Sequence, residues 1–92
     1  MNPILSKLGT EEILCQLAEE ASELAKAALK LRRATMCVNP TPVSPARAYA
    51  DLMEEFADVF LCMKIFGYDA DSVAVTMSRK EYRWMKRLEE LR

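Results

Sequence analysis

The stretch "LAEEASELAKAALKLRR", Leu17 to Arg33, decides the fold of this 92-residue chain. Together with the residues just before it, this stretch repeats apolar side chains at a helical period, at Ile13, Leu17, Ala21, Leu24, Ala28 and Leu31. On a helical wheel of about 100° per residue, Glu20 falls about 20° from Ile13, inside the apolar stripe. The sequence therefore predicts an amphipathic helix that carries a carboxylate within its apolar face.

The ends of this first helix follow from its flanking polar residues. Thr10 is a suitable N-cap because two glutamates follow it in the first helical turn. Three cations lie near the C-terminal end: Lys30, Arg32 and Arg33. Positive charge there interacts favourably with the negative end of the helix dipole. The sequence therefore predicts a helix over residues 11–34.

Two further helices are predicted after a proline-rich loop. The segment "VNPTPVSP" holds three of the four prolines, so residues 38–45 form an interhelical loop. Ser44 is a suitable cap for the second helix, which begins at Pro45 and ends at Gly67. The third helix begins after Asp69 or Asp71 and runs to the C-terminus, and a short helical turn is expected near Ile4.

The predicted helices define an all-α fold. The apolar stripe of the second helix is Tyr49, Leu52, Phe56, Val59, Met63 and Phe66, and that of the third is Val73, Met77, Trp84, Leu88 and Leu91. With only two glycines and no strand alternation, residues 1–92 form a single helical domain, a small bundle of three main helices. Because so short a chain buries a limited core, we expect homo-oligomerisation, as a dimer or tetramer, to complete the bundle.

Charge and cysteine content exclude several classes of partner. A net charge of −1, from 13 basic and 14 acidic residues, gives no global field to attract nucleic acid or an anionic membrane. No apolar run is long enough to span a bilayer, and the three cysteines have no CxxC spacing. A cytoplasmic protein with reduced thiols is expected, with neither nucleic acid nor membrane as a partner.

Two helices each border their apolar stripe with acids, and this is the candidate functional feature. Glu20 and Glu23 lie on the first helix, and Glu55 and Asp58 lie on the second at the same i, i+3 spacing. If the two stripes pack together, these carboxylates converge, and a hard divalent cation such as Mg²⁺ would relieve their repulsion. A di-iron site normally needs histidine, which the chain lacks. The open alternative is that both acid pairs are solvated helix faces.

The motifs "EEASE" (19–23) and "EFAD" (55–58) resemble the EExxE…ExxD pattern of MazG-like nucleoside triphosphate pyrophosphohydrolases, an all-α family. The resemblance extends over roughly residues 10–90. It implies cleavage of a nucleoside triphosphate between the α and β phosphates, giving a monophosphate and pyrophosphate, with Mg²⁺ or, as a substitute, Mn²⁺. The implied metal ligands are Glu20, Glu23, Glu55 and Asp58, and Glu19 would orient or deprotonate the attacking water.

The third helix carries a basic edge beside its apolar stripe. Lys80 and Arg83 lie on this edge, and both the charge and the family resemblance predict that they contact substrate phosphates. Solvated bases or salt bridges to the acids are the alternative, and they are the favoured interpretation of Arg87. The chain departs from the family pattern in its long proline-rich loop and in having no asparagine after Asn39.

Two other functions stay open from the sequence. One is a non-catalytic helical module for oligomerisation or partner binding, in which the acidic edges pair with the basic edge. The other is a degenerate family member that binds nucleotides without hydrolysing them. Turnover of triphosphates, Mg²⁺-dependent stabilisation and nucleotide binding separate the three.

Overall fold

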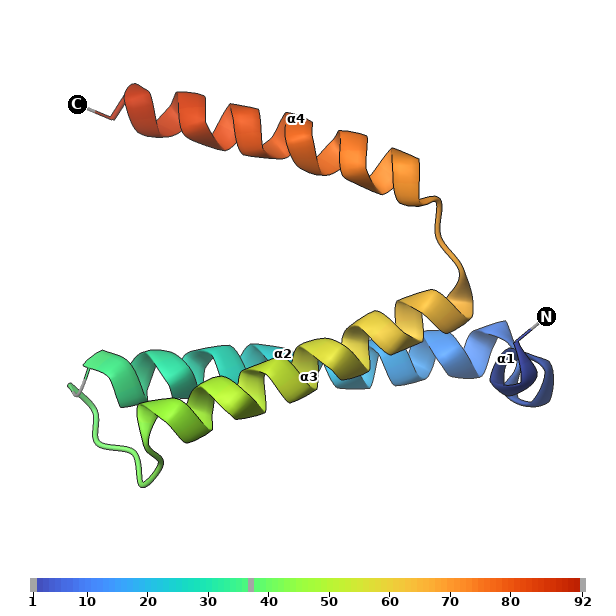
Figure 1. The fold of residues 1–92 in the computed structure, drawn as a ribbon, viewed down its shortest axis with the longest axis horizontal. Coiled ribbons are helices and arrows are strands. Elements are labelled where there is room, and N and C mark those ends of the chain that lie inside the picture. The colour runs from blue at the N-terminus through green and yellow to red at the C-terminus, as the bar shows by residue number, and fades with distance from the viewer. Residues whose placement is uncertain (1, 37, 92) are drawn as a thin grey trace.

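The computed structural model describes residues 2–36 and 38–91, and this part of the chain contains four helices and no strand. The helices are α1 (Pro3–Leu8), α2 (Thr10–Met36), α3 (Pro45–Phe66) and α4 (Ala70–Glu89), as Figure 1 shows. The all-α prediction is confirmed, as are its three main helices and the short helical turn near Ile4.

Side-chain caps fix where three of the helices begin. Ser44 Oγ accepts a hydrogen bond from the Arg47 amide at 3.1 Å, as predicted for the start of α3. Asp69 Oδ1 accepts from the Ser72 amide at 3.0 Å, which selects Asp69 rather than Asp71 as the cap of α4. Asn2 caps α1, because its Oδ1 accepts a hydrogen bond from the Ile4 amide at 2.8 Å.

The start of α2 differs from the predicted N-cap. Thr10 is the first helical residue rather than the cap. The Gly9 carbonyl oxygen accepts a hydrogen bond from the Ile13 amide, with 3.2 Å between oxygen and nitrogen. Gly9 also ends α1, with a φ of 85° that side-chain-bearing residues rarely adopt. One glycine therefore ends the first helix and begins the second, which leaves no residue between them for a polar cap.

Helices α2 and α3 form an antiparallel hairpin joined by the proline-rich loop, and they lie side by side in Figure 1. The residues most buried along this contact are small or of moderate size: Ile13, Ala27 and Ala34 on α2, and Ala48, Cys62 and Ile65 on α3. Small side chains allow two helices to approach closely, because little volume separates their backbones. The core of one chain is therefore the narrow contact between these two helices.

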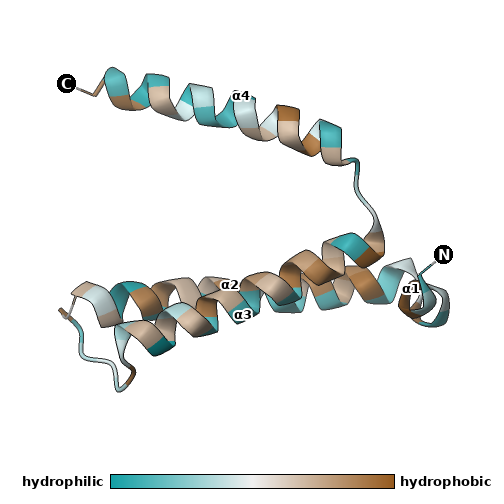
Figure 2. Cartoon of the chain, viewed as in Figure 1, coloured by the Kyte–Doolittle hydropathy of each residue, from teal (hydrophilic) through white to brown (hydrophobic). Residues whose placement is uncertain are grey.

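The predicted apolar stripe of α3 is only partly correct. Leu52, Val59 and Met63 are half-buried, but Tyr49 and Phe56 are 56% and 52% exposed. The most buried residues of α3 are Ala48, Cys62 and Ile65, which lie about 40° to 140° from Leu52 on a helical wheel, on the side where Glu55 and Asp58 also lie. Other apolar residues of α3, such as Met53, Phe60 and Leu61, are exposed, and hydrophobic colour covers much of its ribbon in Figure 2. Periodicity alone therefore does not identify the packed face.

After Gly67 the chain turns back, and α4 runs along the length of the α2–α3 hairpin but apart from it (Figure 1). No Cα atom of α4 lies within 8 Å of a Cα atom in another helix, and all of its described side chains are exposed. The predicted stripe of α4 is therefore uncovered, with Trp84 63% and Met77 65% exposed. Within one chain the expected bundle of three main helices is not closed.

The radius of gyration and the accessible surface area are both larger than those of a compact chain. The radius of gyration is 17.0 Å, whereas a compact chain of this length has one of about 12 Å. The accessible surface is 7552 Å², compared with about 5,400 Å² for a compact monomer of the same mass. None of the helices in the described part of the chain is both long enough and apolar enough to cross a membrane.

Candidate metal centre between α2 and α3

Three carboxylates meet where α2 and α3 pack together. Glu20 of α2 and Glu55 and Asp58 of α3 each offer an oxygen, and these oxygens all lie within 4.8 Å of one another. All three residues are half-buried. Of the four carboxylates that the sequence predicts to converge, these three meet, and Glu23 is not among them.

The helical register explains why these side chains converge. Glu55 and Asp58 are three residues apart, so they project from one face of α3. Glu20 lies on the face of α2 that contacts α3, between Ile13 and Ala27, which are both buried. Gln16, one turn earlier, donates a hydrogen bond from Nε2 to Glu20 Oε1 at 2.8 Å, which fixes the orientation of that carboxylate.

The electrostatics of the cluster are unfavourable without a cation. Partial burial raises the pKa of Glu55 above its ordinary value, and the negative charges of Asp58, Glu20, Glu23 and Glu54 raise it further. Among the described residues no base forms an ion pair with these three carboxylates, so apart from the hydrogen bond from Gln16 to Glu20 their charges are left to solvent. A divalent cation at this position would favour the ionised form of Glu55 and oppose the shift.

The donor set fits magnesium. Mg²⁺ takes oxygen ligands in octahedral geometry and usually retains several waters or binds substrate phosphates. Three carboxylates leave coordination positions for those groups. Manganese also accepts such oxygen ligands. Zinc-type coordination is disfavoured, because the sequence has no histidine and burial raises the pKa of the Cys62 thiol beside the cluster.

Cys62 lies beside the cluster but is not equipped as a nucleophile or ligand. It is a free, buried cysteine. Burial raises the pKa of its thiol, and the nearby charges of Glu20 and Asp58 raise it further. The thiol therefore stays protonated at neutral pH, whereas nucleophilic attack and metal binding both need the thiolate.

The remaining predicted site residues lie outside the three-carboxylate cluster. Glu23 forms an ion pair with Lys26, at 3.6 Å between Oε1 and Nζ, although its charge still acts on Glu55. Glu19 is exposed on α2. Lys80 and Arg83 are exposed on α4, so a single chain does not bring these bases to the acids.

A charged groove that the sequence analysis did not identify adjoins the cluster. It has a volume of about 370 Å³ between α2 and α3, and it is lined by Glu23, Lys26, Ala27, Lys30, Arg33, Asp51 and Glu55. Its bases recur at i, i+4 and i+7 along α2, a helical period that was visible in the sequence. Two of them were attributed there to the helix dipole alone, so the shared face was not recognised.

Comparisons of the chain with protein-family models, with curated proteins and with solved structures found no match. The resemblance to MazG-like enzymes therefore remains a prediction from the EExxE and ExxD patterns of this sequence. The geometry adds an independent observation, which is the meeting of Glu20 with both acids of the second pattern. Any assignment of function rests on the chemistry of that cluster.

Proposed function

We propose that this protein is a magnesium-dependent nucleoside triphosphate pyrophosphohydrolase, which cleaves between the α and β phosphates to release a monophosphate and pyrophosphate. The observation that carries the proposal is the convergence of Glu20, Glu55 and Asp58 across the α2–α3 contact. These three residues come from both acidic patterns, which are far apart in the sequence. The α2–α3 contact thus brings together three of the four acids that the proposal uses as metal ligands.

The residues of the cluster have distinct roles in this proposal. Glu20, Glu55 and Asp58 would hold the cation. Glu23, one turn along α2 from Glu20, would become the fourth ligand by exchanging its ion pair with Lys26 for the cation. Bound magnesium would neutralise charge on the phosphate oxygens and lower the pKa of a coordinated water. Glu19 is exposed beside these ligands and would orient that water or accept its proton. No side-chain nucleophile is needed, consistent with the protonated thiol of Cys62.

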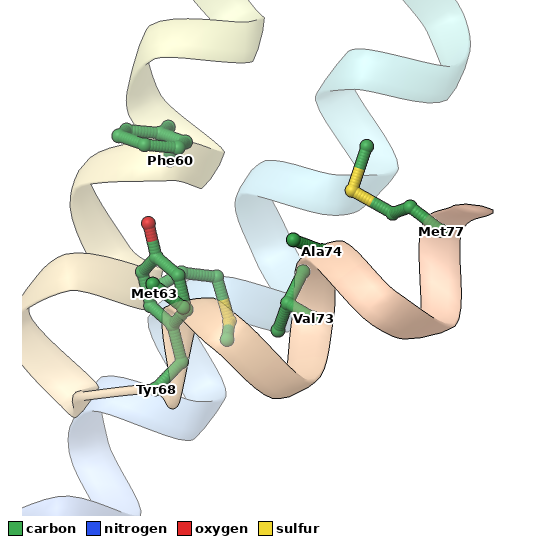
Figure 3. A pocket seen from close by; sticks show the side chains of 7 residues that line it. Phe60, Met63, Tyr68, Val73, Ala74 and Met77 are labelled. Carbon is green, nitrogen blue, oxygen red and sulfur yellow. The ribbon is translucent and has the colours of Figure 1, made fainter.

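Self-association of the chain completes the proposal. One chain exposes roughly 2,000 Å² more surface than a compact monomer of its mass, and obligate interfaces bury about 2,000–5,000 Å² in total. The uncovered surface includes an apolar pocket at the α3–α4 junction, lined by Phe60, Met63, Tyr68, Ala70, Val73, Ala74 and Met77 (Figure 3). A second copy packed against α4 would bury this surface and close the helical bundle.

The same association gives the predicted phosphate contacts a role. Lys80 and Arg83 lie on a helix that does not reach the carboxylates of its own chain. In a dimer or tetramer, α4 of one protomer would present these bases to the triphosphate bound by its partner. Their contribution to substrate binding therefore depends on assembly.

The experiment that tests the function is a screen of the purified chain against the common ribonucleoside and deoxyribonucleoside triphosphates, with Mg²⁺ or Mn²⁺. We expect equal amounts of monophosphate and pyrophosphate from at least one substrate. Glu20→Gln and Glu55→Gln should abolish this release while circular dichroism stays unchanged. Glu54→Gln is the matched control, because Glu54 is an exposed acid next to Glu55 and lies outside the cluster. Full activity in Glu55→Gln would remove the metal-ligand assignment.

The exposed apolar face of α4 favours a second candidate, a non-catalytic module for oligomerisation. This candidate predicts self-association with no turnover of any triphosphate and no stabilisation by Mg²⁺. A nucleotide-binding protein without activity would instead bind a triphosphate and leave it intact. The substrate screen, repeated with equilibrium binding measurements, distinguishes all three.

A further inference from the structure

We propose that the groove between the C-terminal half of α2 and the first turns of α3 binds a polyphosphate group, held by Lys30 and Arg33. The inference rests on the proposed function insofar as the ligand is taken to be the phosphate chain of the substrate. It assigns the primary phosphate contacts to α2 of the same chain, whereas the sequence predicted them on α4.

The groove is continuous with the candidate metal centre. Glu55 belongs to the three-carboxylate cluster and also lines the groove, and Glu23 lines it from the opposite helix. A phosphate bound at the cation would therefore lie at one end of the groove. Further phosphates of the same ligand would extend along α2 toward its C-terminus.

Lys30 and Arg33 are the cations of the groove that lack a protein counter-charge. Lys26 pairs with Glu23, and Asp51 Oδ1 pairs with Arg47 Nε at 3.0 Å. Among the described residues, neither Lys30 nor Arg33 forms an ion pair. The positive charges of Lys30 and Arg33 thus remain available to an anionic ligand. The acids beside them are already engaged, because Glu23 and Asp51 form ion pairs and Glu55 belongs to the candidate metal centre.

These two side chains are also half-buried, unlike the exposed bases of α4. A partly desolvated cation without a counter-ion is unfavourable, and a bound anion would relieve that cost. Along the helix axis, Lys26 to Lys30 spans about 6 Å and Lys30 to Arg33 about 4.5 Å. This spacing presents a row of donors to consecutive phosphates, and the planar guanidinium of Arg33 can contact two oxygens at once.

The helix dipole offers a competing explanation for bases at the end of α2, and the neighbouring Arg32 distinguishes the two. A dipole interaction depends on distance from the helix end, so Arg32 and Arg33 would serve it about equally. Only Arg33 lines the groove, and Arg32 is exposed on another face. Arg32→Gln is therefore a matched control, because it removes the same charge at nearly the same point along the helix.

The test is isothermal titration calorimetry of the full chain with inorganic pyrophosphate and tripolyphosphate, each with and without Mg²⁺. We expect both anions to bind the wild type, more tightly with Mg²⁺, and the affinity to fall as salt concentration rises. Arg33→Gln and Lys30→Gln should each weaken binding roughly tenfold or more, as expected from the loss of a charged hydrogen bond. Arg32→Gln should bind as the wild type does, and Arg33→Lys should retain part of the affinity.

Several results would overturn the inference. One is that neither anion binds the wild type, and another is that Arg32→Gln and Arg33→Gln weaken binding equally, which indicates a general charge effect. Circular dichroism and the retained affinity of Arg33→Lys exclude unfolding as the cause of any loss. Competition by a non-hydrolysable triphosphate, but not by a monophosphate, identifies a nucleotide phosphate chain as the source of the bound group. Competition by neither would indicate a site for free polyphosphate.

Failure of this inference can be separated from failure of the proposed function. If binding of pyrophosphate depends on Arg33 and no triphosphate is hydrolysed, the groove assignment stands and the proposed activity falls. If triphosphates are hydrolysed while Arg33→Gln leaves both KM and pyrophosphate affinity unchanged, the activity stands and the groove assignment falls.

Discussion

Glu20 of α2 and Glu55 of α3 approach each other across the helix contact, with carboxylate oxygens within 4.8 Å. Two like charges at this separation oppose the packing that brings them together, and Asp58 adds a third. A leucine at position 20 would bury apolar surface at this position instead. The repulsion is understandable if the folded chain binds a divalent cation there.

Magnesium should therefore stabilise the fold through this cluster. At a free Mg²⁺ concentration ten times its Kd, linkage contributes about 1.4 kcal/mol, and each kcal/mol raises Tm by roughly 4–8 °C in a domain of this size. We expect Glu55→Gln to abolish the Tm increase and Glu54→Gln to preserve it. Thermal unfolding followed by circular dichroism, with Mg²⁺ and with EDTA, measures both. An equal increase in Glu55→Gln would place the ion elsewhere.

The stability of the metal-free chain should depend on pH through Glu55. Its pKa in the folded chain is raised above the ordinary value of 4.5, so the folded state holds this proton more tightly than the unfolded state does. The free energy of unfolding should accordingly fall as the pH rises from 4.5 through the raised pKa of Glu55. Above that pKa, the stabilisation that the protonated carboxyl provides should be absent. Glu55→Gln lacks this titration, so its stability relative to the wild type should increase over the same window.

Denaturant unfolding at a series of pH values between about 4 and 8, with EDTA present, tests this expectation. Because Mg²⁺ competes with the proton, the affinity of the wild type for Mg²⁺ should rise through the same window. A stability difference between the two proteins that does not change with pH would show that Glu55 has no raised pKa.

The two adjacent glutamates of α2 should behave differently when mutated. Glu20 is half-buried in the cluster, whereas Glu19 is exposed and outside it. We expect Glu19→Gln to keep the Mg²⁺-dependent Tm increase and, if Glu19 acts on the water, to lower kcat by about 10²–10⁴-fold. Glu20→Gln should lose both. Thermal shift and steady-state kinetics on the same preparations separate the roles, and a Glu19→Gln enzyme with wild-type kcat would make Glu19 a solvated residue.

Much of the fold was predictable because the local signals agree with one another. Ser44 followed by Pro45 marks the start of α3, and Asp69 and Asp71 were the two candidate caps of α4, because a cap involves only residues within one helical turn. The helical angle of each acid was predictable in the same way, whereas the meeting of Glu20 with Glu55 and Asp58, without Glu23, also depends on how the two helices pack. Features set by the period of a single helix can therefore be read from its sequence.

Features that depend on which surfaces pack together were harder to predict. Alanines rather than aromatics form much of the α2–α3 contact, because close helix approach favours small side chains and α3 is apolar on several faces. The groove containing Lys30 and Arg33 is created jointly by two helices, so neither helix alone reveals it. The separation of α4 from the hairpin was not predicted, because its stripe has the same period whether its partner is the same chain or another.

Trp84 gives a direct test of what covers α4. It is the sole tryptophan of the sequence, and its side chain is 63% exposed in one chain. If a second copy packs against the stripe, its fluorescence maximum should shift to shorter wavelength as the protein concentration rises, together with an increase in mass by sedimentation. Leu88→Glu places a charge in the stripe and should keep the protein monomeric, with red-shifted emission, since an unpaired buried charge is strongly unfavourable.

Tyr82→Glu is the matched control, because Tyr82 is similarly exposed but lies about 180° from Val73, on the opposite face of α4. A wild-type protein that stays monomeric with unchanged emission at every concentration would show that α4 does not mediate self-association, and Lys80 and Arg83 would then have no route to the carboxylates.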